Sequence, residues 1–123
     1  MTCPFCNLEE SVIKNGLAYV RFDMYPVSNG HMLIVPFRHV SDFFDLSMDE
    51  RNAIFLLVDE VKILLDEKHN PDGYNIGTNV GEFAGQTVWH AHLHVIPRYK
   101  GDMEDPRGGV RWIIPDKAKY WSK

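Results

Sequence analysis

Residues 88–97 alternate between apolar side chains and histidines, and this pattern constrains the chain more than any other. The apolar positions are Ala91, Leu93 and Val95, and the positions beside them are His90, His92 and His94. Side chains two residues apart share one face of a β-strand, whereas on a helix they spread around the axis. The alternation therefore predicts a strand over 88–97 with an apolar face and three imidazoles on the opposite face.

The spacing of the three histidines limits what they can bind together. Residues two apart on a strand lie ~6.6 Å from each other, and residues four apart lie ~13 Å from each other. Because imidazole–zinc bonds are only ~2.0–2.1 Å long, His90 and His92 could share an ion, but one ion bound by all three needs a bulge. We expect three different roles, the alternative being a solvated strand face with incidental histidines.

The remaining pattern predicts an α+β fold. Residues 17–22 and 32–35 are expected to form an antiparallel pair of strands, and residues 74–79 another strand. A shorter helix is expected near residues 2–14. Residues 110–115 are interpreted as either a short strand or an arm.

The clearest helix is predicted to begin at Ser47. Ser47 and Glu50 have the spacing of a capping box, in which each side chain bonds the backbone N–H of the other residue. Asn-Pro-Asp-Gly at 70–73 is predicted to end the helix. The apolar residues that recur at helical spacing, and are expected to be core, are Ile54, Leu57, Val58, Val61, Leu64 and Leu65.

Length and charge exclude several classes of protein. The 123 residues suit a single domain, 1–123, with a tail from about residue 101 to 123. Thirteen Lys and Arg against seventeen Asp and Glu give a net charge of −4, so we expect no nucleic-acid polymer as partner. We also expect no membrane association and a cytoplasmic location, because neither a ~20-residue apolar run nor a signal-peptide pattern is visible.

A loop with donor groups precedes residues 88–97, which we call the histidine segment. Gly85 allows backbone N–H groups to approach an anion closely, and Gln86 and Thr87 add an amide and a hydroxyl. Beside an imidazole, such donors suit a phosphate that is held while a nucleophile attacks it.

These motifs resemble the histidine triad (HIT) superfamily. Residues 85–96, Gly-Gln-Thr-Val-Trp-His-Ala-His-Leu-His-Val-Ile, are similar to its signature, and residues 30–36 resemble an upstream block. The resemblance extends from Cys3 to about Lys100. It implies a HIT-like antiparallel sheet and cleavage at the α-phosphate of a nucleotide through a covalent nucleotidyl-histidine. The motif is more similar to the fragile-histidine-triad branch of diadenosine polyphosphate hydrolases than to the nucleoside phosphoramidases, which are the alternative.

The resemblance implies a role for each matched residue. It makes His92 the nucleophile, His94 a phosphate contact and His31 a further histidine at the edge of the site. Thr87 matches the residue that bonds the leaving-group oxygen. Asp23 matches the ribose-binding carboxylate, although a turn-forming Asp is an equal interpretation. The further phosphate contacts are Asn79, Gly85 and Gln86.

The two cysteines, Cys3 and Cys6, are separated by two residues. In a reducing compartment this spacing indicates half of a metal site or a redox motif. The resemblance implies a structural zinc held by Cys3, Cys6, His39 and His90, with no catalytic metal required. A Cys₂His₂ set is closed and tetrahedral, which suits a structural ion.

The resemblance also implies a homodimer, with the tail reaching the partner's site. Two other functions stay open: a zinc-stabilised nucleotide-binding module with little turnover, and a hydrolase whose catalytic ion is bound by His90 and His92. In the tail, we interpret the following as mainly solvated or packing residues rather than substrate contacts: Arg98, Lys100, Arg107, Arg111, Trp112 and Trp121.

Overall fold

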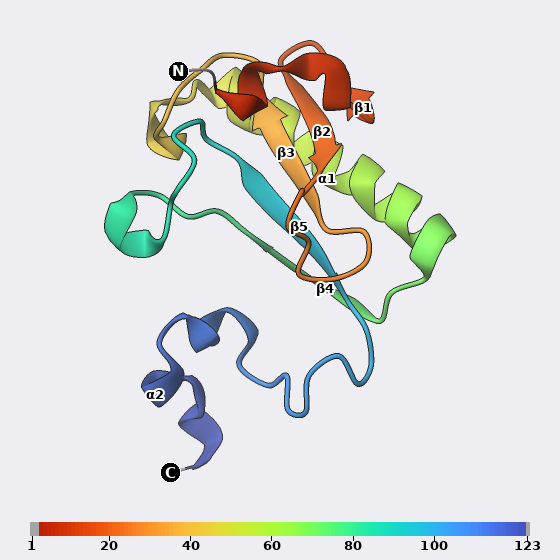
Figure 1. Ribbon diagram of the computed structural model, residues 1–123, viewed down its shortest axis with the longest axis vertical. Helices are drawn as coiled ribbons and strands as arrows, with labels where there is room; N and C mark the ends of the chain where they lie inside the picture. The colour runs from red at the N-terminus through yellow and green to blue at the C-terminus, as the bar shows by residue number, and fades with distance from the viewer. Residues whose placement is uncertain (1–2, 123) are drawn as a thin grey trace.

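The computed structural model describes residues 3–122 and shows an α+β fold, with one antiparallel sheet and a long helix across one of its faces (Figure 1). In order across the sheet, the strands are β1 (Ile13–Lys14), β2 (Ala18–Phe22), β3 (Met32–Pro36), β5 (Leu93–Arg98) and β4 (Gly73–Gly77). The expected pairing of the first two strands is confirmed, with Val20 opposite Ile34. β5 lies between β3 and β4, so both of its backbone edges are paired.

Helix α1 (Met48–His69) matches the prediction at both ends. Ser47 accepts the Glu50 N–H, Glu50 accepts the Ser47 N–H, and Asn70 ends the helix in the left-handed conformation. The predicted stripe is confirmed as core, since Leu57 and Val61 are fully buried against the sheet. Burial of one such side chain stabilises the fold by ~1.5–3 kcal/mol.

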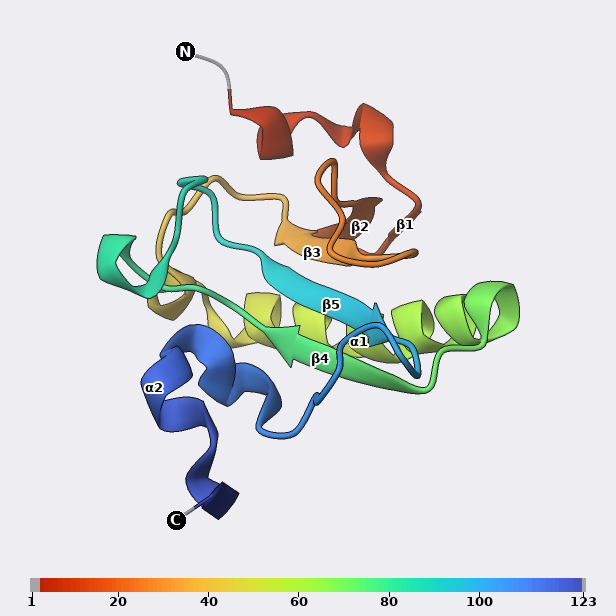
Figure 2. The same ribbon diagram turned by 60° about the horizontal axis from the view of Figure 1, so that its bottom comes forward.

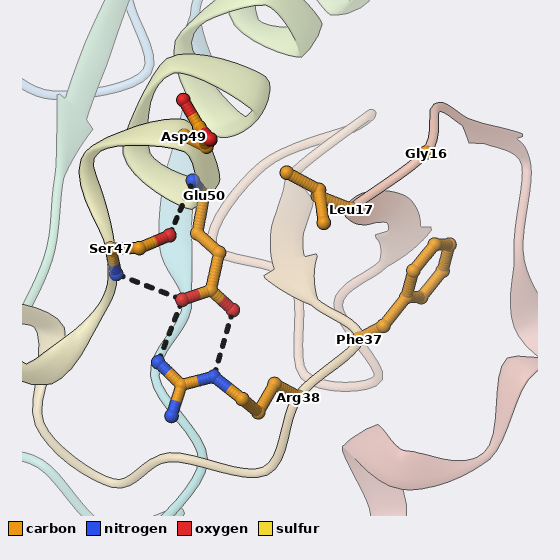
Figure 3. A pocket seen from close by; sticks show the side chains of 7 residues that line it. All are labelled: Gly16, Leu17, Phe37, Arg38, Ser47, Asp49 and Glu50. Atoms are coloured by element: carbon orange, nitrogen blue, oxygen red, sulfur yellow. Dashed lines mark hydrogen bonds and ion pairs between the residues drawn. The ribbon is translucent and has the colours of Figure 1, made fainter.

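Arg38 joins the start of α1 to the segment that leaves β3 (Figure 3). Its guanidinium donates to both carboxylate oxygens of Glu50, at 3.1 and 2.7 Å. The hydrogen bonds from Arg38 lower the pKa of Glu50 to about 2. The ion pair therefore restrains the backbone next to His39, which is one of the predicted metal ligands.

The N-terminal segment covers the sheet face opposite α1 (Figure 2). The prediction of a shorter N-terminal helix is wrong, because the chain forms two 3₁₀ turns, Pro4–Cys6 and Leu8–Glu10, before β1. Asn7 separates the turns because its side chain accepts the Glu9 N–H and starts the second turn. Thr2, where the helix was expected to begin, lies outside the described residues.

The prediction begins the strand over 88–97 too early and ends the strand over 74–79 too late. β5 begins only at Leu93, because the Ala91 N–H bonds the Val40 carbonyl and the His90 ring bonds the Pro36 carbonyl. These contacts keep residues 88–92 out of the regular strand ladder. The predicted alternation still holds, because the apolar side chains face the core and the histidines face away from it. β4 ends at Gly77, and Thr78 bonds the His92 carbonyl through its side chain.

The tail contains helical turns, so of the two alternatives for 110–115, a short strand or an arm, the strand is wrong. Residues Gly109–Ile113 form a 3₁₀ turn and Pro115–Ala118 form α2. Arg111 donates to the carbonyls of Lys117 and Ala118, which closes the tail on itself. Figures 1 and 2 show it gathered at the β4 side of the sheet. In the described part of the chain, no helix is both long and apolar enough to span a bilayer.

Candidate active site and metal cluster

The histidine segment presents two different faces. Ala91, Leu93 and Val95 lie in the core beneath α1, as the alternation predicted. The three histidines point to the other face, where Cys3 contacts His90 and Phe5 contacts His92. The rings of His92 and His94 are 5.1 Å apart between centroids, so these two imidazoles form one site.

His90 belongs to a separate cluster with Cys3, Cys6 and His39. Their ligand atoms all lie within 4.8 Å of one another, so the four residues could hold a metal ion. The two sulfurs come together because one 3₁₀ turn places residues three apart side by side. This grouping matches the predicted ligand set and leaves His92 out of it.

The distances in this cluster fit a tetrahedral ion. His39 Nδ1 and His90 Nδ1 are 3.2 Å apart, and three of the sulfur–nitrogen distances are 3.3 to 3.6 Å. Zinc bonds of ~2.0–2.1 Å to nitrogen and ~2.3 Å to sulfur give edges of ~3.3 Å between nitrogens and ~3.6 Å between nitrogen and sulfur. The donor set therefore has the right size for zinc.

The environment of His90 also suits a ligand. Its Nε2–H donates to the Pro36 carbonyl at 2.8 Å, which leaves Nδ1 without a proton and directed at the cysteines. Burial lowers the pKa of His90, so the ring stays neutral. Desolvation and the nearby Cys3 raise the pKa of the Cys6 thiol, an effect that a bound dication would reverse.

His92 is fixed in one tautomer by the backbone. Its Nδ1–H donates to the His90 carbonyl at 2.8 Å, and a carbonyl can only accept. Burial lowers the pKa of His92, so Nε2 carries a free lone pair near neutral pH. Thr78 donates to the His92 carbonyl at 2.7 Å, and Phe5 packs against the ring at 4.9 Å.

His94 is the end of a hydrogen-bond chain that passes through His31. The Val27 N–H donates to His31 Nδ1 at 3.0 Å, so the neutral His31 ring carries its proton on Nε2. That nitrogen lies 2.9 Å from His94 Nδ1, which must therefore accept. The proton of neutral His94 is then on Nε2, where it can be donated to a bound group.

Asp23 completes this chain. Its Oδ2 lies 3.3 Å from His31 Nε2, and its Oδ1 accepts the Tyr25 N–H at 2.8 Å. Asp23, His31 and His94 are also close enough to share an ion. A metal on His31 Nε2 would force the ring proton onto Nδ1, against the Val27 N–H, so this geometry favours a hydrogen-bond chain over a metal site.

His31 and His94, the two histidines of this hydrogen-bond chain, are kept neutral. Burial lowers the pKa of His31, with Asp23 acting in the opposite direction. Burial, with smaller contributions from His92 and His31, lowers the pKa of His94 to about 4. His94 is thus a neutral hydrogen-bond donor at physiological pH.

The glycine loop has a fixed shape. Gly81 and Gly85 have φ of 94° and 96°, a conformation that favours glycine. The Gln86 side chain is used within the loop: it accepts the Gly81 N–H and donates to the Ser41 and Val88 carbonyls. Thr87 is exposed, and Asn79 lies beside Gly85.

Four residues of the site belong to none of the motifs from which the site was predicted. Phe5 and Thr78 contact His92, while Tyr19 and Arg21 donate to the backbone of the Pro4–Cys6 turn. Only the strand alternation, which puts Tyr19 and Arg21 on the same face as the histidines, could have suggested two of them.

The tail residues bond mainly to one another and to nearby backbone. Arg98 pairs with Asp102 and bonds Asn75, and Arg107 pairs with Asp105. Trp112 donates to the Arg107 carbonyl. These contacts agree with their interpretation as packing or solvated residues.

Comparison with known proteins gives a consistent match. The family model described as the HIT domain matches residues 7–101. A HIT family protein of Bacillus anthracis superposes with a TM-score of 0.76 at 34% identity, covering 82% of this chain and 76% of that one. A zinc-bound histidine triad family protein of Mycobacterium smegmatis has a TM-score of 0.75 at 27% identity, covering 97% of this chain and 95% of that one. The AP-4-A phosphorylase of Mycobacterium tuberculosis is 34% identical over 92 residues, which are 74% of this chain and 47% of that protein.

Proposed function

Because the chain belongs to the HIT domain family, we propose that it is a nucleotide hydrolase or transferase that cleaves dinucleoside polyphosphates at the α-phosphate. Family membership and the similarity to AP-4-A phosphorylase support a nucleotide-processing activity. That relative is matched over only about half of its length, so its name supports a chemical class of substrate and no particular substrate.

The observation that carries the proposal is the tautomer of His92. Its Nδ1–H is held by the His90 carbonyl, and burial disfavours protonation, so Nε2 is a neutral nucleophile. In the proposed step, Nε2 attacks the α-phosphorus and the bond from phosphorus to the leaving-group oxygen breaks. The leaving phosphate departs as an anion and His92 keeps its Nδ1 proton on the His90 carbonyl, so the adduct is a nucleotidyl-imidazolium. Water or another acceptor then attacks the same phosphorus, loses a proton to solvent and returns Nε2 of His92 with its lone pair.

The neighbouring groups suit the charge that develops in this step. His94 presents Nε2–H as a donor to a phosphoryl oxygen, because His31 supplies the hydrogen bond at Nδ1. Thr87 has an exposed hydroxyl for the leaving-group oxygen. Asp23 supports His31 and stays a predicted ribose ligand, while Asn79 and Gly85 stay predicted phosphate contacts. For Gln86 we propose a positioning role in the loop, since its amide is already used there.

We propose zinc as the ion of the Cys3, Cys6, His39 and His90 cluster. The tetrahedral size of the cluster and its Cys₂His₂ composition support zinc, and the zinc-bound relative shows that a related protein takes this metal. A closed donor set leaves no position for substrate, so the ion would anchor the N-terminal segment to the sheet.

A homodimer in the cytoplasm completes the proposal. β4 is an edge strand, and α1 exposes Phe55, Leu56 and Ile63 to solvent. A sheet edge and exposed apolar side chains are both features that favour self-association. Sedimentation of the full chain at several concentrations would test it, and a monomer at all of them would refute it.

The decisive experiment is to trap the covalent intermediate. Protein mixed with an α-³²P-labelled dinucleoside polyphosphate and quenched with denaturant at high pH, where phosphorus–nitrogen bonds persist, should carry label on His92. His92→Asn should bind nucleotide, form no adduct and lose turnover. An adduct or normal turnover in His92→Asn would refute the assignment, and binding without turnover in the wild type would favour a binding module. Nucleoside phosphoramidates in the same assay would distinguish the second branch.

A further inference from the structure

Phe5 lies between the metal cluster and the proposed nucleophile. Its ring centroid is 4.9 Å from that of His92, with the planes 79° apart, and 6.2 Å from that of His90. The side chain is 8% exposed. One apolar ring therefore contacts both a candidate metal ligand and the imidazole that carries the proposed chemistry.

The turn that carries Phe5 is closed by the two cysteines. Cys3 precedes the Pro4–Cys6 turn and Cys6 is its last residue, and the Cys6 N–H donates to the Cys3 carbonyl at 3.2 Å. Both sulfurs lie in the Cys₂His₂ cluster. An ion bound there would fix both ends of the turn and so the position of the ring between them.

Two side chains of β2 hold the same turn from the sheet. The Tyr19 hydroxyl donates to the Phe5 carbonyl at 2.6 Å, and Arg21 Nη1 donates to the Pro4 carbonyl at 2.9 Å. The Arg21 guanidinium lies 5.1 Å from the Phe5 ring centroid, and Arg21 is only 3% exposed. Burying an arginine costs free energy, and here the ring and one carbonyl are its contacts with this turn.

His92 needs such a contact. The hydrogen bond from its Nδ1 to a carbonyl sets which nitrogen is free, but a single bond at one edge leaves the ring plane able to tilt. A nearly perpendicular aromatic ring restricts that tilt. Attack at phosphorus depends on the direction of the Nε2 lone pair, and a misplacement of ~1 Å can reduce a rate ~10²-fold.

We propose that Phe5 is a positioning residue for His92, and that the Cys3–Cys6 metal site acts on the nucleophile through it. The inference rests on the proposed nucleotidyl transfer for its kinetic consequence. Its structural part, the fixed orientation of the His92 ring, can be measured in protein without substrate.

The test compares Phe5→Leu with a matched control, Phe37→Leu. Phe37 packs in the same apolar cluster but stacks on Tyr19, at 6.1 Å. We expect Phe5→Leu to lower kcat 10- to 100-fold with KM and AMP affinity within about twofold of wild type, and Phe37→Leu to leave kcat nearly unchanged. Tyr19→Phe keeps the aromatic rings at positions 19 and 5 and removes the hydrogen bond from Tyr19 to the Phe5 carbonyl, so it should lower kcat by a smaller factor.

The second readout is the ¹⁵N spectrum of the His92 side chain. Wild-type protein should show a single Nδ1–H tautomer with sharp side-chain resonances, whereas Phe5→Leu should keep the tautomer and show resonances broadened by exchange between ring orientations. Removing zinc should produce the same change in wild type and little further change in Phe5→Leu. Thermal unfolding of each sample establishes that the remaining domain is folded.

Three results would overturn the inference. They are an unchanged His92 spectrum in folded Phe5→Leu, an equal loss of kcat in Phe37→Leu, and a loss that appears in KM instead of kcat. Absence of turnover in wild type would refute the proposed function instead, and the spectrum alone would then decide the positioning role.

Discussion

Replacing Glu50 with Gln isolates the charge that joins α1 to the segment carrying His39. Glu50 accepts two bonds from Arg38 and one from the Ser47 N–H. Glutamine also forms capping boxes, so its side-chain oxygen can still accept the Ser47 N–H. What the variant loses is the carboxylate opposite the guanidinium, while the volume of the side chain is kept.

The size of the effect follows from the pKa of Glu50. In the folded chain it is about 2, against an ordinary value of 4.5. At ~1.4 kcal/mol for each pKa unit, the ionised form stabilises the fold by about 3 kcal/mol. Arg38 is 55% exposed, so solvent screening reduces this value, and we expect a loss of about 2 kcal/mol at pH 7 in Glu50→Gln.

The pH dependence has a definite sign. Below pH 4.5 the unfolded chain binds a proton at Glu50, whereas the folded chain does not until about pH 2. The stability that Glu50 contributes is therefore complete above pH 4.5 and lost as the pH falls towards 2. The difference between wild type and Glu50→Gln should shrink over the same range.

Urea unfolding monitored by circular dichroism measures both quantities. Wild type and Glu50→Gln should differ by about 2 kcal/mol at pH 7 and by much less at pH 2.5, with equal m-values. Ser47→Ala is the control, because losing the cap costs ~1 kcal/mol without removing the charge pair. A difference below ~0.5 kcal/mol at pH 7, or one that is the same at both pH values, would refute the reasoning.

Three further predictions concern the site itself. The pKa of His94 is about 4 in the folded chain and 6.5 ordinarily, so the unfolded chain binds a proton first as the pH falls. Lowering the pH from 7 to 5 should therefore remove about 2 kcal/mol of stability from wild type that His94→Asn does not lose. Urea unfolding measures both proteins, and an equal loss in the two would contradict this prediction. Chelation of zinc, or Cys3→Ser, should lower the thermal midpoint in calorimetry together with bound zinc measured by atomic absorption; a variant with normal zinc content would exclude Cys3 as a ligand. Thr78→Val removes the hydrogen bond to the His92 carbonyl and should lower kcat several-fold with KM unchanged, whereas an effect on KM alone would place Thr78 at the substrate.

The structure confirms the parts of the prediction that depend on local chemistry. The capping box at Ser47, the apolar stripe and the turn at Asn70 describe interactions within a few residues, so the sequence contains all the partners. The ends of β5 and the form of the N-terminal segment were missed for the opposite reason. The start of β5 depends on the Val40 and Pro36 carbonyls, which are distant in the chain. The first N-terminal turn is held by the distant side chains of Tyr19 and Arg21, although Asn7 starts the second turn locally.

The alternation of residues 91–95 by itself determined that the histidines share the face opposite the core. Only the tertiary structure decided which nitrogen of each imidazole carries the proton, because that depends on its hydrogen-bond partner. The Pro36 carbonyl turns His90 Nδ1 towards the cysteines, the His90 carbonyl frees His92 Nε2, and His31 makes His94 a donor. Three identical side chains in one short motif have different hydrogen-bonding states because two backbone carbonyls and one other imidazole hold them differently.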